Sequence, residues 1–384
     1  MPEQFFCLRY FSIPAAPELS SGCGKKGYMI NLIDCKKTYY GRNRESKDMK
    51  IHFAPMEGIT GHVFRRAYSR HFSGISEYYS PFLTPNQTRK LTSREMEDVR
   101  PENNQGIRLI PQILTNQAED FLWAARKLNE MGYDTVNLNL GCPSATVVPK
   151  RRGAGFLGIP EELDRFFERV SRELETYSMG LSVKTRIGME EPEEFSTLLS
   201  IYNRYPLKKL IIHPRLQTDY YKNHPNLEVF ASAVASSENP VCYNGDIFSV
   251  ENAESFQNRF PGVGEIMLGR GLLSNPFLAE ALTQKGEDLP QVLGNVPGSR
   301  ACRQRLAAFH GELLEGYGRV MSGDRNVLFK MKELWAYLGF LFEGEEKLLK
   351  KIKKAQKMAD YQAVTEELIW NGAMKEHPSF GGWK

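Results

Sequence analysis

The stretch from Val136 to Pro143 carries the residues of this chain that are best suited to chemistry. It reads VNLNLGCP, an apolar strand that ends in a polar residue, a glycine, a thiol and a proline. The glycine permits a tight turn and the proline stops the strand, so the pattern predicts a loop that presents Cys142 rather than buries it. The alternative is that Cys142 only fills space, since free cysteine is among the most buried residue types.

Short β-rich runs alternate with amphipathic helical segments after residue 48. The runs cover residues 50–56, 75–82, 108–114, 135–141, 181–187, 209–215, 240–246 and 265–271, and helical spacing marks residues 116–131, 161–177 and 193–205. Eight strands in alternation with helices predict an α/β fold of the (β/α)8 TIM-barrel class. A doubly wound open sheet is the alternative, but it would more often place a glycine-rich loop after its first strand, where this chain has APMEG.

Polar or glycine-rich residues end nearly every predicted strand, and a barrel carries its catalytic residues at these ends. In chain order these residues are Pro55, Met56, Gln112, Asn139, Cys142, Lys184, Arg186, His213, Arg215, Asn244, Gly245, Asp246, Gly269, Arg270 and Gly271. Each alone has a structural explanation, such as a satisfied core amide or a turn glycine. Their coincidence at one rim favours a site.

The last two strand ends indicate the ligand. Loops after the seventh and eighth strands of such barrels often bind phosphate, and Gly245, Gly269 and Arg270 supply close-approach glycines and a cation. Lys184 could place positive charge against the N1/O2 edge of a flavin, and Gln112 could meet the amide edge of its ring. FMN is the favoured cofactor, and a sugar phosphate is the alternative.

Composition narrows the class of protein. The chain has 384 residues, a formal charge of +4 and 41% hydrophobic residues, without an apolar run of the roughly 18 residues that a membrane span needs. Its six cysteines form no CxxC pair, which fits neither a zinc site nor a disulfide framework. The apolar residues 5–16 are interrupted by Arg9 and Pro14. We therefore expect a cytoplasmic protein with no metal site and no membrane contact.

The two ends of the chain differ from the barrel pattern. Residues 1–48 lack an amphipathic period and are interpreted as a disordered extension or an over-extended start, before an FMN-binding barrel over residues 49–285. Residues 286–298 are rich in Gly and Pro and predict a linker, followed by a small helical domain over residues 299–376. That domain is basic, with Arg300, Arg303, Arg305, Arg325, Lys330, Lys332, Lys347, Lys350, Lys351, Lys353, Lys354 and Lys357. These cations suit nucleic-acid phosphates, although a solvated helix face is the alternative.

Taken together, the motifs resemble those of the tRNA-dihydrouridine synthase family. The matching segments are APMEG (54–58), PQI (111–113), NLNLGCP (137–143), VKTRIG (183–188), HPR (213–215), YNGD (243–246) and LGRG (268–271). The loop at residues 150–157 departs from the family pattern, with more positive charge and a bulkier Phe156.

The resemblance implies an FMN enzyme that reduces the C5–C6 double bond of a uridine in tRNA, with NADPH as the electron source. Hydride would come from reduced FMN and the proton from Cys142, whose thiol is mostly protonated at neutral pH. The matching flavin-binding positions are Pro55, Met56, Glu57, Gln112, Lys184, His213, Asn244, Gly245, Asp246, Gly269 and Arg270. Asn139 and Arg215 match substrate-binding positions.

The resemblance implies tRNA as the partner and a monomer without an obligate protein partner. Two other functions stay open from the residues alone. An FMN barrel acting on a free pyrimidine would need no basic tail, and a non-catalytic RNA-binding protein would have no use for Cys142 beside a flavin site.

Overall fold

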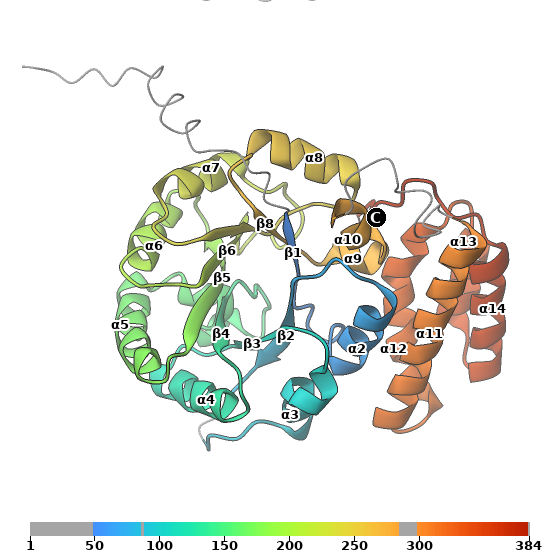
Figure 1. Cartoon of the computed structure of the whole chain (residues 1–384), viewed down its shortest axis with the longest axis horizontal. Helices are drawn as coiled ribbons and strands as arrows, with labels where there is room; N and C mark the ends of the chain where they lie inside the picture. The colour runs from blue at the N-terminus through green and yellow to red at the C-terminus, as the bar shows by residue number, and fades with distance from the viewer. Residues whose placement is uncertain (1–48, 86–87, 284–297, 383–384) are drawn as a thin grey trace, which may run out of the picture. The chain divides into compact units, whose positions relative to one another are not determined.

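The computed structural model describes residues 49–85, 88–283 and 298–382. The predicted extension at residues 1–48 and nearly all of the predicted linker lie outside the described residues. The chain is shown in Figure 1, coloured from the N-terminus to the C-terminus.

Within the described residues, eight parallel strands close into a barrel, each paired with the next along the chain and β8 with β1 (Figure 1). They are β1 (Lys50–Phe53), β2 (Glu77–Leu83), β3 (Leu109–Ile113), β4 (Thr135–Leu140), β5 (Gly180–Gly188), β6 (Lys209–Leu216), β7 (Val241–Tyr243) and β8 (Glu265–Leu268). The predicted (β/α)8 fold is confirmed. Strands β7 and β8 are shorter than predicted. The polar residues predicted to end β7 lie in the loop after it, and Gly269 precedes a short helix that begins at Arg270.

Helices surround the barrel and follow the strands in turn (Figure 1). They are α2 (His62–His71), α3 (Ser93–Val99), α4 (Ala118–Glu130), α5 (Pro160–Thr176), α6 (Glu194–Tyr202), α7 (Leu227–Ser236), α8 (Val250–Arg259), α9 (Arg270–Ser274) and α10 (Leu278–Thr283). Helix α5 shows why they form: Leu163, Phe166, Phe167, Val170 and Leu174 recur every three to four residues and are buried on one face. The three predicted helical segments coincide with α4, α5 and α6.

The lower end of the barrel, where the strands begin, is closed by paired charges. Lys209 Nζ lies 2.6 Å from a carboxylate oxygen of Glu77 and 2.7 Å from one of Glu265. Burial alone would raise the pKa of Glu265, but hydrogen bonds from His52 and Lys209 lower it to about 2. An apolar layer of Ala54, Tyr79, Ile110, Ile211, Cys242 and Met267 lies inside the barrel. We therefore expect the reactive residues at the opposite end of the barrel, where the strands finish.

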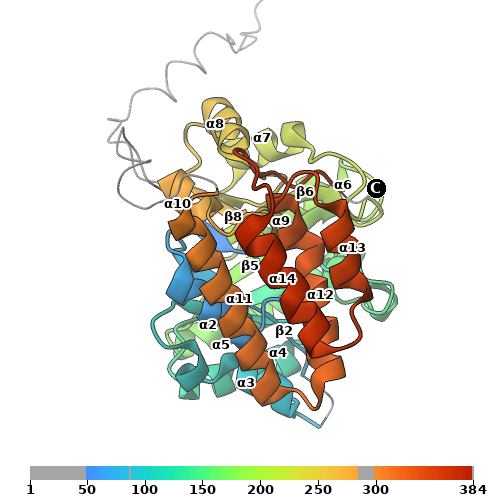
Figure 2. The same ribbon diagram turned by 90° about the vertical axis from the view of Figure 1, so that its right-hand side faces the viewer.

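Four further helices, α11 (Arg300–Val320), α12 (Asp324–Leu338), α13 (Glu346–Lys354) and α14 (Met358–Asn371), form the C-terminal part of the chain (Figure 2). The short turn η4 (Gly339–Leu341) links α12 to α13. The ring of Phe309 in α11 lies 5.8 Å from that of Phe64 in α2 and 5.1 Å from that of Phe72. These residues belong to one continuous hydrophobic core with the barrel. Helix α11 therefore completes the packing of α2.

Two of the arginines predicted to meet nucleic acid hold the protein together instead. Arg303 donates to the carbonyl oxygens of Ile369 and Gly372, and Arg305 donates to that of His71.

Among the helices of the described residues, none combines the length and apolar character needed to cross a membrane.

Candidate active site

The loops after the strands gather most of the predicted cofactor residues around one small cavity. Pro55, Met56, Lys184, His213, Asn244, Gly245, Asp246, Gly269 and Arg270 line it, and its volume is about 50 Å³. Two predicted cofactor residues lie elsewhere: Glu57 is exposed, and Gln112 is buried and bonded to other amides. We call this cavity and its surroundings the barrel mouth.

Lys184 brings an ammonium group to the mouth from β5. Among the described residues, its Nζ takes part in no hydrogen bond or ion pair, although it lines the cavity. Burial and the charge of Arg186 lower the pKa of Lys184 to about 8. An enclosed cation without a partner fits an anionic group of a ligand.

Asp246 lies between two guanidinium groups. Arg215 donates from both terminal nitrogens to the two carboxylate oxygens, and Nη2 of Arg270 donates to Oδ1 at 2.6 Å. Arg215 is buried, also donates to the carbonyl of Asn223, and lies 2.9 Å from Nε2 of His213. Burial and the surrounding cations hold the pKa of His213 well below its ordinary value, so its neutral ring accepts from Arg215. The sequence predicted that Arg215 binds substrate. In the structure its donors are directed at three residues of the protein itself.

Aromatic rings enclose the guanidinium of Arg270. Its central carbon lies 4.4 Å from the ring centre of Tyr221 and 5.2 Å from those of Phe248 and Phe380. Our sequence reasoning missed all three rings, because they come from distant parts of the chain and share no motif. Tyr221 is 48% exposed, so its ring covers Arg270 from the solvent side.

Gly245 is required by a close approach inside the mouth. A Cβ at this position would stand 2.0 Å from the hydroxyl oxygen of Tyr243. Gly269 is less tightly confined, with a Cβ expected 3.1 Å from the sulfur of Met56. Both glycines let the backbone loops converge on Asp246 and Arg270.

Cys142 lies in the loop after β4, and three neighbours hold this loop. Oδ1 of Asn139 accepts from the backbone N–H groups of Gly141 and Cys142, at 3.0 and 2.9 Å. Arg186, which is buried, donates from Nε to the carbonyl of Gly141 at 3.0 Å. Gly153 has φ +57°, and a Cβ there would stand 2.8 Å from the carbonyl oxygen of Cys142. Asn139, predicted to bind substrate, therefore also shapes the loop that carries the thiol.

The thiol of Cys142 is half-buried. Burial raises the pKa of the thiol, against the opposing effect of a hydrogen bond from the Ser144 backbone. A thiol with a raised pKa remains protonated at neutral pH and can donate a proton.

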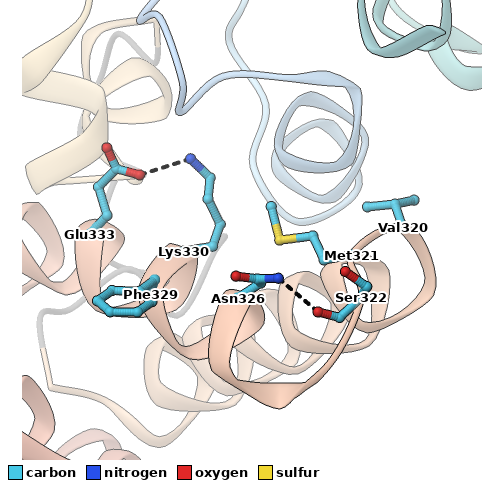
Figure 3. Close-up of a pocket in the computed structure, with 7 residues that line it drawn as sticks. All are labelled: Val320, Met321, Ser322, Asn326, Phe329, Lys330 and Glu333. Carbon is cyan, nitrogen blue, oxygen red and sulfur yellow. Dashed lines mark hydrogen bonds and ion pairs between the residues drawn. The ribbon is translucent and has the colours of Figure 1, made fainter.

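A larger cavity of about 680 Å³ lies at the end of α11 and the start of α12, and Figure 3 shows its lining. Its polar groups are bonded to one another: Asn326 donates to the carbonyl of Ser322 at 2.7 Å, and Lys330 to Glu333 at 2.9 Å (Figure 3). Phe329 in its wall is 62% exposed. Because no polar groups converge on a common point there, the barrel mouth is the better candidate for chemistry.

The donor set at the mouth fits the flavin mononucleotide expected from the sequence. Arg270 can exchange its pairing with Asp246 for a phosphate, and the ammonium of Lys184 is available for the electron-rich edge of the ring. The described residues hold no group of three or more His, Cys, Asp or Glu side chains suited to a metal ion.

Fold and mouth together define a (β/α)8 barrel that carries a protonated thiol and a cluster of cations where its strands end. A profile described as Dihydrouridine synthase (Dus) matches residues 52–368. The chain belongs to the dihydrouridine synthase family.

Among its relatives is the tRNA-dihydrouridine(16) synthase of Pseudomonas putida, 29% identical over 236 residues, which cover 60% of this chain and 72% of that protein. The tRNA-dihydrouridine synthase B of Vibrio vulnificus is 25% identical over 278 residues, which cover 69% of this chain and 82% of that protein.

Proposed function

We propose that this protein reduces a uridine of tRNA to dihydrouridine, with FMN as its cofactor and NADPH as the electron source. The observation that carries the proposal is Cys142, a protonated thiol next to a cation-lined mouth in a chain of the dihydrouridine synthase family. The two relatives described above are named for this activity on tRNA.

The roles of the side chains follow from their chemistry. Bound FMN supplies the hydride that the reduction needs. Cys142 donates the proton to C5 of the uracil, for which its raised pKa keeps it in the right protonation state. Lys184 balances negative charge at the edge of the flavin ring, and Arg270 holds the phosphate. Arg215 donates to the neutral ring of His213 and fixes Asp246, so it acts through these residues.

The test is reduction of unmodified tRNA by the purified protein with FMN and NADPH, followed by mass spectrometry of the digested RNA. We expect dihydrouridine at a defined position, and a yellow protein that binds FMN without a covalent bond. Parallel reactions with uracil and orotate address the alternative of a small-molecule reductase. Reduction of these pyrimidines without reduction of tRNA would replace our proposal, and tRNA binding by a protein that takes up no flavin would favour the RNA-binding alternative.

The target base is stacked in folded tRNA, and its extrusion costs a few kcal/mol, which contacts to phosphates must offset. Six lysines on and just after α13 are available for such contacts: Lys347, Lys350, Lys351, Lys353, Lys354 and Lys357 are all exposed. Among the described residues they form no ion pair, whereas Lys330 is paired with Glu333. Lys347, Lys350 and Lys354 recur at a helical spacing that places them on one face of α13. We propose that this α13 lysine face meets the tRNA backbone.

We expect the triple variant Lys347→Gln, Lys350→Gln, Lys354→Gln to bind tRNA more weakly while it still binds FMN. Loss of three phosphate contacts should reduce the slope of log affinity against log salt by about 2 to 3. The measurement is tRNA affinity by filter binding at several salt concentrations. A control with the same change of charge replaces Lys50, Lys127 and Lys208, three exposed lysines outside the mouth, of which Lys50 pairs with Glu265 and Lys127 with Glu130. Equal slopes for the two triple variants would mean that the α13 lysines are an ordinary solvated surface.

A further inference from the structure

An unbroken chain of buried side chains leads from the interior of β5 to the loop of Cys142. Nδ2 of Asn137 donates to Oγ of Ser182 at 2.9 Å, and Nε2 of Gln112 donates to Oδ1 of Asn137 at 2.7 Å. Nδ2 of Asn139 donates to Oε1 of Gln112 at 2.7 Å. Oδ1 of Asn139 then accepts from the N–H groups of the Cys142 loop. We call Ser182, Asn137, Gln112 and Asn139 the amide chain.

The direction of every bond in the amide chain follows from its last link. The backbone N–H groups of Gly141 and Cys142 can only donate, so the atom of Asn139 that meets them must be its oxygen. The nitrogen of Asn139 must then face the oxygen of Gln112. By the same reasoning, the nitrogen of Gln112 faces the oxygen of Asn137. No member can turn over without bringing two donors or two acceptors together.

Burial makes this arrangement rigid. Asn137 and Gln112 are 0% exposed and Ser182 is 1% exposed, so bulk water cannot replace a lost partner. The strand register aligns Gln112 with Asn137, and Asn137 with Ser182. Asn137 and Ser182 come two residues before Asn139 and Lys184 on their strands, so they lie one layer deeper than the mouth and do not line its cavity.

We propose that Asn137 and Ser182 are positioning residues for the reaction. They hold the amide of Gln112 at its inner end, and through Gln112 and Asn139 they fix the loop that carries the Cys142 thiol. Gln112 and Asn139 each keep one N–H hydrogen outside the amide chain, in a direction that the chain sets. This inference rests on the proposed reduction of uridine.

The decisive variant is Asn137→Leu, which keeps the branched shape of the side chain but removes the acceptor of Gln112 and the donor to Ser182. We expect kcat for tRNA to fall by about 10- to 100-fold with little change in KM, because misplaced groups slow the chemical step more than they weaken binding. The visible absorption spectrum of bound FMN should shift. In the FMN-free protein, the Cys142 peptide should react faster with iodoacetamide, as measured by mass spectrometry, because its loop is less tightly held.

Asn137→Asp should restore most of the activity. A carboxyl group in either protonation state still accepts from Gln112, and the hydroxyl of Ser182 can rotate to pair with it. Thr135→Val is the matched control, since it removes a buried polar side chain of β4 outside the amide chain, and we expect it to leave all three measurements unchanged.

If Asn137→Leu fails to fold, Ser182→Ala provides the same test, with smaller expected changes in the same direction. The inference is overturned if a folded Asn137→Leu or Ser182→Ala variant matches the wild type in kcat, FMN spectrum and alkylation rate. A wild-type protein that makes no dihydrouridine would instead refute the proposed function, and the alkylation rates would still report whether the amide chain holds the loop.

Discussion

Cys142→Ala protein is expected to bind FMN as the wild type does and to form dihydrouridine in tRNA about 10² to 10⁴ times more slowly. This range is the usual loss when a general acid is removed while the rest of the site remains. The thiol is held by backbone contacts of its loop, so alanine leaves those contacts in place. Single-turnover formation of dihydrouridine is the measurement. Unchanged turnover would mean that Cys142 only fills space and donates no proton. Cys302→Ala, which removes a buried thiol from α11, is the control.

The pH dependence gives this prediction a second signature. Because burial raises the pKa of Cys142, the protonated acid persists to higher pH than the roughly 8.5 of a free cysteine. With FMN kept saturating, turnover on tRNA should therefore be flat through neutral pH and fall only as pH rises through that raised pKa. The residual activity of Cys142→Ala should lack this alkaline decline. A decline that persists unchanged in the variant would assign the titration to another group.

Lys184→Met is expected to weaken FMN binding by about 10- to 100-fold, which corresponds to the loss of one charge-assisted hydrogen bond. Methionine is unbranched like lysine and only one heavy atom shorter, and it removes the charge and the donors. Fluorescence titration of FMN-free protein is the measurement. Lys184→Arg keeps the positive charge and is the matched control. Equal affinities for the Met variant and the wild type would remove Lys184 from the cofactor site.

The pKa of Lys184 also predicts a pH effect. This pKa is lowered to about 8, so the ammonium is present below that pH and is lost above it. FMN affinity of the wild type should therefore be highest at neutral pH and decrease as pH rises through about 8. Lys184→Arg should bind equally across this range, because arginine stays charged. Lys184→Met should also be flat, but at the lower affinity.

The barrel could be predicted from the sequence because its signal is local. Each strand is a short run buried on both faces, and each helix shows its own apolar period. The ends of most strands could also be predicted, because polar residues interrupt the apolar runs there. For this reason most of the predicted cofactor residues do line one cavity.

The pairing of the polar residues at the mouth could not be predicted in the same way. Arg215 and Asp246 are 31 residues apart, and their contact depends on how the loop after β7 folds against the end of the neighbouring strand β6. The sequence therefore could not distinguish an arginine that meets substrate from one that is bonded within the protein. Phe380 was missed for a related reason: the chain returns to Arg270 only after the C-terminal helices α11 to α14.

The packing of α11 against α2 has a consequence during synthesis of the protein. Glu312 follows its hydrogen-bond partner His71 by 241 residues, so a ribosome making 5 to 20 residues per second needs roughly 10 to 50 s to supply the second partner. For that time the aromatic surface of α2 lacks its cover and is open to aggregation or to chaperones. A chain truncated by a stop codon ahead of α11 should therefore be present in the cell at a much lower level than the full-length protein.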